Sequence, residues 1–170
     1  GTPYGVLTVS NNTADYGGIY YTDELVNVTN LFISGNYDNN TASYGAVIFS
    51  EGNIVNSKVY GNYTNNHARM GIDIILSADN VEISGNYVNN TISDGGVIYM
   101  GYCDGNSIVH DSIFINNNVG DEPIISALIN PIFALNNWFG NNATNYNMTP
   151  NVSQNVTLIN WLFLNATTNA

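Results

Sequence analysis

The feature that most constrains the fold of this chain is an internal repeat. The hexapeptide Gly-Asn-Tyr-x-Asn-Asn begins at Gly35, Gly61 and Gly85, so that successive copies start 26 and 24 residues apart. A fixed period of this length is typical of a solenoid, in which each repeat is one structural unit stacked on the next.

Each period also contains two other recurring runs. Apolar runs led by glycine occupy 17–21, 45–49, 71–76 and 95–99, and runs that precede the next motif copy occupy 31–34, 57–60, 81–84 and 112–115. Val, Ile, Tyr and Phe bounded by Gly and Asn favour strands, whereas the long Leu/Ala/Glu/Lys segments of helical repeats are missing. We therefore predict an all-β fold, a right-handed single-stranded parallel β-helix with three strands per coil. About six coils would stack about 4.8 Å apart.

Stacking explains the abundance of asparagine. Equivalent residues of successive coils lie above one another, where like charges would repel and an amide can donate to one neighbour and accept from the other. Asparagine also tolerates the left-handed backbone angles of tight corners. The predicted structural ladder is Asn40, Asn66, Asn90 and Asn117, and the preceding asparagines 39, 65 and 89 are the alternative candidates.

Tyr37, Tyr63 and Tyr87 should likewise form a stacked column. The strand alternation leaves its direction open. The rings either pack inward with their hydroxyls at the rim of the coil or lie exposed on the outside.

Composition excludes several partners. Lys and Arg number 2 against 13 Asp and Glu, for a net charge of −11, so nucleic acid would be repelled. There is no basic cluster for anionic lipid and no run of 18 apolar residues, so we expect no membrane insertion by this segment. The single cysteine, Cys103, permits neither an intrachain disulfide nor a thiolate metal site, and we expect it to be a small buried hydrophobe. We expect a monomer without cofactor.

The motifs resemble the repeats of polymorphic outer-membrane proteins. Tyr37-x-x-Asn40 and its three later counterparts, the last of them Phe114-x-x-Asn117, resemble one of the two short family motifs, and Gly95-Gly96-Val97-Ile98 resembles the other. Overall the chain is most similar to the adhesin-like surface proteins of methanogenic archaea, where Asn137-Trp138-Phe139-Gly140 resembles the segment that closes the β-helix. The resemblance implies an extracellular module at the cell surface, anchored to the cell wall or membrane through regions outside this fragment.

We predict two regions, with β-helix repeats over 1–120 and the last coil and a C-terminal cap over 121–170, leading to a following domain. An open last coil exposes core and unpaired backbone, so a covering element is needed. Its predicted core consists of the large apolar residues Trp138, Phe139, Trp161, Leu162 and Phe163.

Enzyme chemistry is the minor alternative, because this fold also carries polysaccharide lyases and glycoside hydrolases. A lyase needs a basic residue beside several carboxylates that hold Ca²⁺, but the only cations are Lys58 and Arg69, the latter near one corner with Asp73. A hydrolase needs facing carboxyl groups. The only set offered is Asp94, Asp104, His110 and Asp111, which we interpret as solvated turn residues. We therefore predict no catalytic residues and no metal site.

Two functions remain. The first is attachment to a glycan or protein on the surface of a partner cell, and the alternative is a rigid stalk or spacer that projects other domains. Tyrosine-bearing, weakly charged faces suit carbohydrate by ring stacking and hydrogen bonding. The predicted ligand contacts are Tyr99, Tyr102 and Asp104, in and beside a longer loop, 100–106, that interrupts the repeat.

Overall fold

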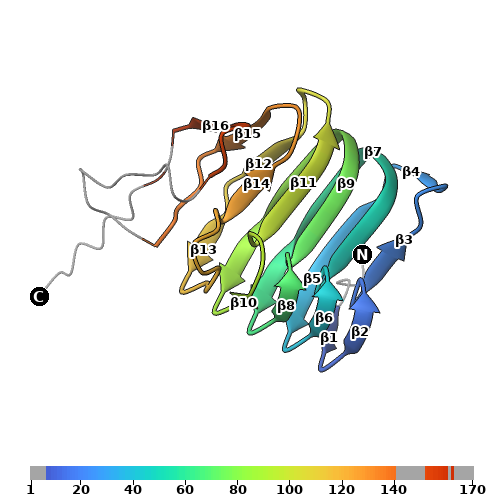
Figure 1. Cartoon of the computed structure of the whole chain (residues 1–170), viewed down its shortest axis with the longest axis vertical. Helices are drawn as coiled ribbons and strands as arrows, with labels where there is room; N and C mark the ends of the chain where they lie inside the picture. Colours follow the sequence, from blue (N-terminus) through green and yellow to red (C-terminus); the bar gives the residue numbers. More distant parts are fainter. Residues whose placement is uncertain (1–6, 141–151, 161, 163–170) are drawn as a thin grey trace, which may run out of the picture.

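The computed structural model describes residues 7–140, 152–160 and 162, which form a parallel β-solenoid of about five turns (Figure 1). The strand pairs within these residues are parallel, and equivalent strands of successive coils lie side by side. The predicted parallel β-helix is thereby confirmed. The strands are β1 (Thr8–Ser10), β2 (Thr13–Tyr16), β3 (Tyr20–Thr22), β4 (Asn27–Thr29), β5 (Phe32–Asp38), β6 (Thr41–Tyr44), β7 (Ile48–Thr64), β8 (His67–Met70), β9 (Asp73–Val88), β10 (Thr91–Ile92), β11 (Ile98–Cys103), β12 (Ile108–His110), β13 (Ile113–Ile115), β14 (Ile125–Ala127), β15 (Ile132–Leu135) and β16 (Val156–Ile159).

One coil has three sides. In the central coil, β7 covers two of them, 48–55 and 57–64, and bends between them at Asn56, while β8 covers the third. β7 pairs with β9 of the next coil from Ile48↔Asp73 to Thr64↔Val88, with one irregularity after Ser50. The third sides form a separate sheet in the order β10-β8-β6-β2.

The described residues contain about five turns, whereas about six coils were predicted for the whole chain. Val9, Tyr37, Tyr63, Tyr87 and Phe114 occupy equivalent positions, and the ring of Phe139 stacks on Phe114 one turn further on. This series spans about five turns. The prediction of about six came from dividing all 170 residues by the repeat length, which includes residues outside the described coils.

The corners depend on residues with positive φ. Asn39, Asn65 and Asn89, the alternative candidates for the ladder, have φ of 53°, 54° and 56° and turn the chain between its second and third sides. Asparagine adopts this left-handed conformation more readily than other residues with a side chain. These residues are therefore exposed corner residues, while their successors form the buried ladder.

The predicted asparagine ladder is present and continuous through Asn40, Asn66, Asn90 and Asn117. In each step the backbone N–H and the side-chain Nδ2 both donate to Oδ1 of the next coil's asparagine, at 3.0 Å each from Asn40 to Asn66. Nδ2 also donates to a carbonyl of the preceding coil, such as Tyr37 O for Asn66 at 3.0 Å. The fully buried amides are thus paired on both sides, which avoids the cost of burying an unpaired polar group.

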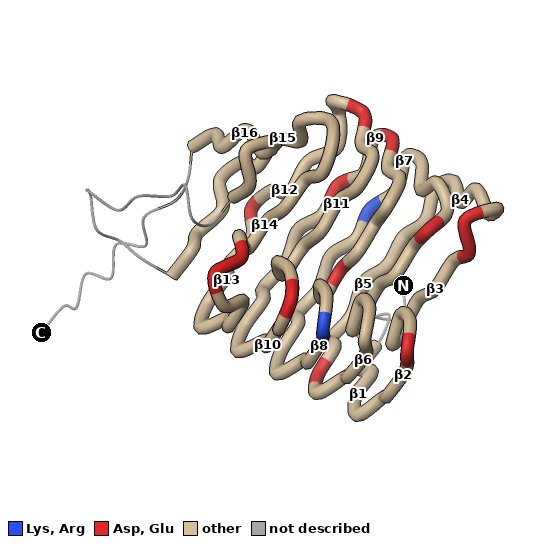
Figure 2. Tube along the Cα trace, in the orientation of Figure 1, with Lys and Arg blue, Asp and Glu red and all other residues tan. Residues whose placement is uncertain are grey.

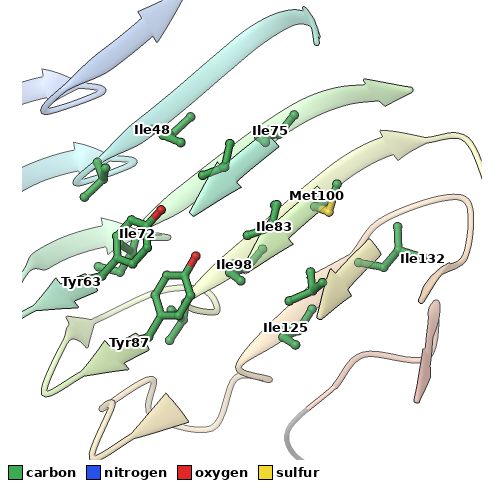
Figure 3. Packing of buried hydrophobic residues seen from close by; sticks show 14 of the residues in the cluster. Ile48, Tyr63, Ile72, Ile75, Ile83, Tyr87, Ile98, Met100, Ile125 and Ile132 are labelled. Atoms are coloured by element: carbon green, nitrogen blue, oxygen red, sulfur yellow. The ribbon is translucent and has the colours of Figure 1, made fainter. Parts of the chain in front are cut away.

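The tyrosine column points inward. Rings of Tyr37, Tyr63 and Tyr87 are at most 1% exposed and are followed by Phe114. The rings of Tyr63 and Tyr87 stack with centroids 4.3 Å apart and an interplanar angle of 4°, in contact with isoleucines of the core (Figure 3). The expectation that the hydroxyls reach the rim is wrong for Tyr63 and Tyr87, whose hydroxyl groups are buried as well.

The solenoid continues past residue 120 without a break in stacking. β14 pairs with β11, β15 pairs with β12, and β16 pairs with β15. Of the predicted cap core, Phe139 is buried against Phe114, Trp138 bridges to Ile113, and Leu162 is 42% exposed. Trp161 and Phe163 lie outside the described residues.

Cys103 is a free, buried thiol, as predicted, and burial raises its pKa to about 12.

Candidate functional site: an aromatic groove

The strongest candidate site is a groove of about 370 Å³ on the outside of the coil, which we call the aromatic groove. It runs along the corner between the third side of one coil and the first side of the next. Its lining is Tyr16, Tyr44, Phe49, Glu51, Met70, Ile74, Leu76 and Tyr99.

Two columns of residues in register form the walls. Tyr16, Tyr44 and Met70 stack at the ends of β2, β6 and β8, and the second column runs through β3, β7, β9 and β11. The members of this second column are Tyr21, Phe49, Ile74 and Tyr99.

Glycine directs the two columns toward each other. Gly17 and Gly45 directly follow Tyr16 and Tyr44 and have φ of 51° and 61°, and a Cβ at Gly45 would lie 2.0 Å from the carbonyl oxygen of Ile48. Only glycine fits such a tight corner. The rings of Tyr44 and Phe49 consequently approach to 5.7 Å between centroids.

The result is an apolar cluster separate from the solenoid interior. Phe49 and Ile74 are 5% and 0% exposed, although neither belongs to the interior core. Ring faces repeat from coil to coil: Tyr16 and Tyr44 are 5.3 Å apart at an angle of 10°, and Tyr21 and Phe49 are 5.9 Å apart at 6°. Tyr16 and Tyr21 are about half exposed, at 50% and 47%, so aromatic surface is available to a partner.

Polar groups stand at the edge of the groove. The Tyr21 hydroxyl donates to Glu51 Oε2 at 3.3 Å, and desolvation, Asp23 and Glu51 together raise its pKa. The Arg69 guanidinium lies 5.8 Å from the centre of the Tyr44 ring and donates to its hydroxyl at 3.4 Å. Flat apolar faces beside hydrogen-bonding groups can stack on a ring and fix its orientation.

The structure separates the three predicted contact residues. Tyr99 lies in the aromatic groove, whereas Tyr102 pairs with Ser77 near the end of β11 and is 61% exposed. The predicted loop is shorter than expected, because β11 extends through Cys103.

Asp104 serves the turn that follows β11. It accepts hydrogen bonds from the Asn80 backbone N–H at 3.0 Å, Asn106 Nδ2 at 2.7 Å and Ser107 Oγ at 3.1 Å. Partial burial raises the pKa of Asp104, but these hydrogen bonds outweigh it and lower the pKa below its usual value. Its oxygens are therefore occupied by the turn.

Sequence reasoning missed Tyr16, Tyr44 and Phe49. A signal was present, since an aromatic residue precedes the corner glycine at Tyr16 and Tyr44 and another follows five residues later at Tyr21 and Phe49. Whether these aromatic residues come together depends on the angle between the two strands at the corner, and that angle cannot be read from the sequence.

Asp73 carries the one carboxyl group buried in the described interior. It occupies the column of Ile48 and Ile98 and is fully buried. Arg69 lies near the same corner, on the other side of Gly71, as predicted, but its side chain is exposed, so the two groups do not share one surface. Tyr87 Oη donates to Asp73 Oδ2 at 2.7 Å, while Oδ1 has no hydrogen-bond partner among the described residues. Burial raises the pKa of Asp73 to about 7, and the Tyr87 hydrogen bond partly opposes the rise. The Asp73 carboxyl group therefore has no exposed surface.

The other acids considered for catalysis lie in different settings. Asp94 faces Arg69 at 3.8 Å, Asp104 belongs to the turn, and Asp111 contacts His110 Nδ1 at 2.8 Å. Within the described ranges, no three His, Cys, Asp or Glu side chains are grouped to hold a metal. Acidic residues are scattered over the coils rather than gathered on one face (Figure 2).

Comparison of the chain with protein-family models, curated proteins and solved structures finds no match. The resemblance to adhesin-like proteins accordingly stays a prediction. Of the residues that the structure describes, none belongs to a helix long and apolar enough to span a membrane.

Proposed function

We propose that this chain is an extracellular, adhesin-like recognition module that attaches a cell surface to a glycan or protein of a partner cell. The observation that carries the proposal is the aromatic groove, in which Tyr16, Tyr44 and Tyr99 line a hollow outside the folded core. Aromatic side chains there are not needed to fill the solenoid interior, so their stacked arrangement favours contact with a partner.

The physical properties of the groove suit recognition of sugar rings. Tyrosine offers a flat apolar face and a hydroxyl group with little loss of side-chain entropy, and the strands beneath hold both in place. The weakly charged surface, with 9% charged residues, limits nonspecific attraction. In this proposal the module acts as a monomer, without catalysis or cofactor.

A glycan and cell-binding array with the purified chain tests the proposal. Tyr44→Ala should reduce any specific signal about tenfold, since an aromatic stack contributes about 0.5–1.5 kcal/mol beyond buried area. Tyr102→Ala is the matched control, an exposed tyrosine outside the groove. Loss with Tyr102→Ala alone would move the contact to the turn after β11, and an array without signal would contradict recognition.

A rigid stalk is the second candidate. It is favoured by the unbroken ladder from Asn12 through Asn117, in which every coil is bonded to the next. A stalk would bind nothing in the array, and its aromatic groove could be replaced without functional effect.

A further inference from the structure

A second groove, which we call the axial groove, lies on a different side of the solenoid, outside β5, β7 and β9. It encloses about 550 Å³ and runs over the stacked glycines Gly35, Gly61 and Gly85. Leu7 and Asp111 stand at its two ends, so that it crosses five successive coils. At about 4.8 Å per coil its length is roughly 19 Å.

The glycines explain why the surface is hollow here. A Cβ at Gly61 would lie 2.5 Å from the carbonyl oxygen of Gly35 and 3.0 Å from Cε2 of Tyr37, and one at Gly85 would meet Gly61 and Tyr63 in the same way. The inward side of the strand is therefore already filled by a tyrosine ring of the previous coil. Glycine lets the backbone lie close against that ring. The outer surface is therefore recessed along the row of glycines.

One wall of the axial groove is a row of amides. Asn62 Nδ2 donates to Asn36 Oδ1 at 2.7 Å, and Asn86 Nδ2 donates to Asn62 Oδ1 at 2.8 Å. Each Nδ2 carries two N–H groups, so this ladder leaves one on Asn62 and one on Asn86 without an acceptor among the described residues. The row offers donors and acceptors at the spacing of the coils.

The opposite wall carries Tyr60, which is 44% exposed and packs edge-on against Phe32 at 5.3 Å. The neighbouring outward column contains Lys58 and Glu82, whose charges are paired with each other at 2.7 Å. The central part of the axial groove thus combines the ring of Tyr60, which stands between Ser34 and Ser84, with uncharged amides.

These features select among polymers. The overall charge of −11 repels polyanions, and a polycation would find only the carboxylate of Asp111, at one end of the groove, to pair with. A polypeptide strand advances about 3.3 Å per residue, and this repeat distance does not match the spacing of about 4.8 Å between the amides. A chain of uncharged sugar rings carries hydroxyl donors and acceptors along both edges and apolar C–H faces for Tyr60.

We propose that the axial groove binds a neutral polysaccharide chain lying along the solenoid axis. This site is separate from the aromatic groove, and the proposal stands whether or not the aromatic groove binds a ligand. The amides of Asn62 and Asn86 bond to the sugar hydroxyls, and Tyr60 packs against the face of a ring.

The test is affinity gel electrophoresis of the whole chain in gels that contain a soluble neutral glucan, a soluble neutral mannan or an acidic polyuronate. We expect retardation by at least one neutral polymer and none by the polyuronate. Tyr60→Ala should lower the association constant about tenfold. Asn62→Asp, which places a charge in the middle of the amide row, should abolish retardation. Thermal unfolding of each variant checks that the fold is kept, and Tyr60→Ala decides the question if Asn62→Asp unfolds.

Control variants separate this site from the other surfaces. Tyr102→Ala, an exposed tyrosine that lines neither groove, should keep the retardation of the wild type. The proposal would be overturned if neither of the two neutral polymers retarded the chain. Equal retardation of Tyr60→Ala and wild type, or stronger retardation by the polyuronate, would also overturn it. Loss of retardation with Tyr44→Ala alone would also overturn it and would support the aromatic groove instead.

Discussion

Tyrosine and asparagine occur on both the inner and the outer surface of the coil, but they have different roles on the two surfaces. Inside, Tyr63 is fully buried in a ring stack and Asn66 is fully bonded in a ladder. Outside, on the same strand or its neighbours, Tyr60 is half exposed and Asn62 forms a ladder that faces solvent. Both asparagine ladders repeat with the same period, so repetition alone does not distinguish residues that hold the fold together from residues that meet a partner.

The largest expected difference between the two surfaces is in the tyrosines. Tyr63→Ala should lower the free energy of unfolding by about 4 kcal/mol, because it removes a buried ring from between two others and leaves a cavity. Tyr60→Ala, the matched outer variant, should change it by about 0.5 kcal/mol. Urea unfolding followed by circular dichroism gives both values, and equal losses would erase the distinction between inner and outer columns.

The asparagines should follow the same order with a smaller effect. Asn66→Ala should lower the free energy of unfolding by about 3 kcal/mol, because the backbone N–H and Nδ2 of Asn40 lose their acceptor at a fully buried position. Asn62→Ala removes only exposed hydrogen bonds, and a change of about 0.5 kcal/mol is expected. A loss at position 62 as large as that at position 66 would show that exposed ladders also stabilise the solenoid.

The smallest of the three effects concerns the charge inside the coil. The pKa of Asp73 is raised in the folded state, so the folded form binds the proton more tightly than the unfolded chain does. The stability contributed by the protonated carboxyl group is present below about pH 4 and is lost as the pH rises through about 7. Between pH 5 and 8 the wild type should lose about 2 kcal/mol relative to Asp73→Asn, which keeps an acceptor for the Tyr87 hydroxyl.

Unfolding free energies of wild type and Asp73→Asn at several pH values measure this difference. The hydroxyls of Tyr37, Tyr63 and Tyr87 are the other ionisable groups that interact with Asp73, and all three have raised pKa values that keep them protonated over this range. Parallel pH profiles for the two proteins would contradict the assignment of the pH dependence to Asp73.

Sequence reasoning was most successful where the repeat itself fixed the geometry. The ladder of Asn40, Asn66 and Asn90 followed from residues two dozen apart lying above one another, which backbone hydrogen bonding between parallel strands enforces. It was least successful for Asp73, which fills a position that is isoleucine in the coils on either side. A residue that departs from its column cannot be placed by the repeat pattern.

The sequence by itself determined the parallel stacking, the corner asparagines and the buried amide ladder, because the spacing of identical residues sets the register between coils. Only the tertiary structure decided that the tyrosines point inward, that Asp73 is buried, and that Tyr44 and Phe49 converge in the aromatic groove. The physical reason is that these outcomes depend on the angles between the three sides of a coil. Those angles come from local backbone conformation at Gly45 and Asn56 and from packing across the interior, and neither is encoded in the length of the period.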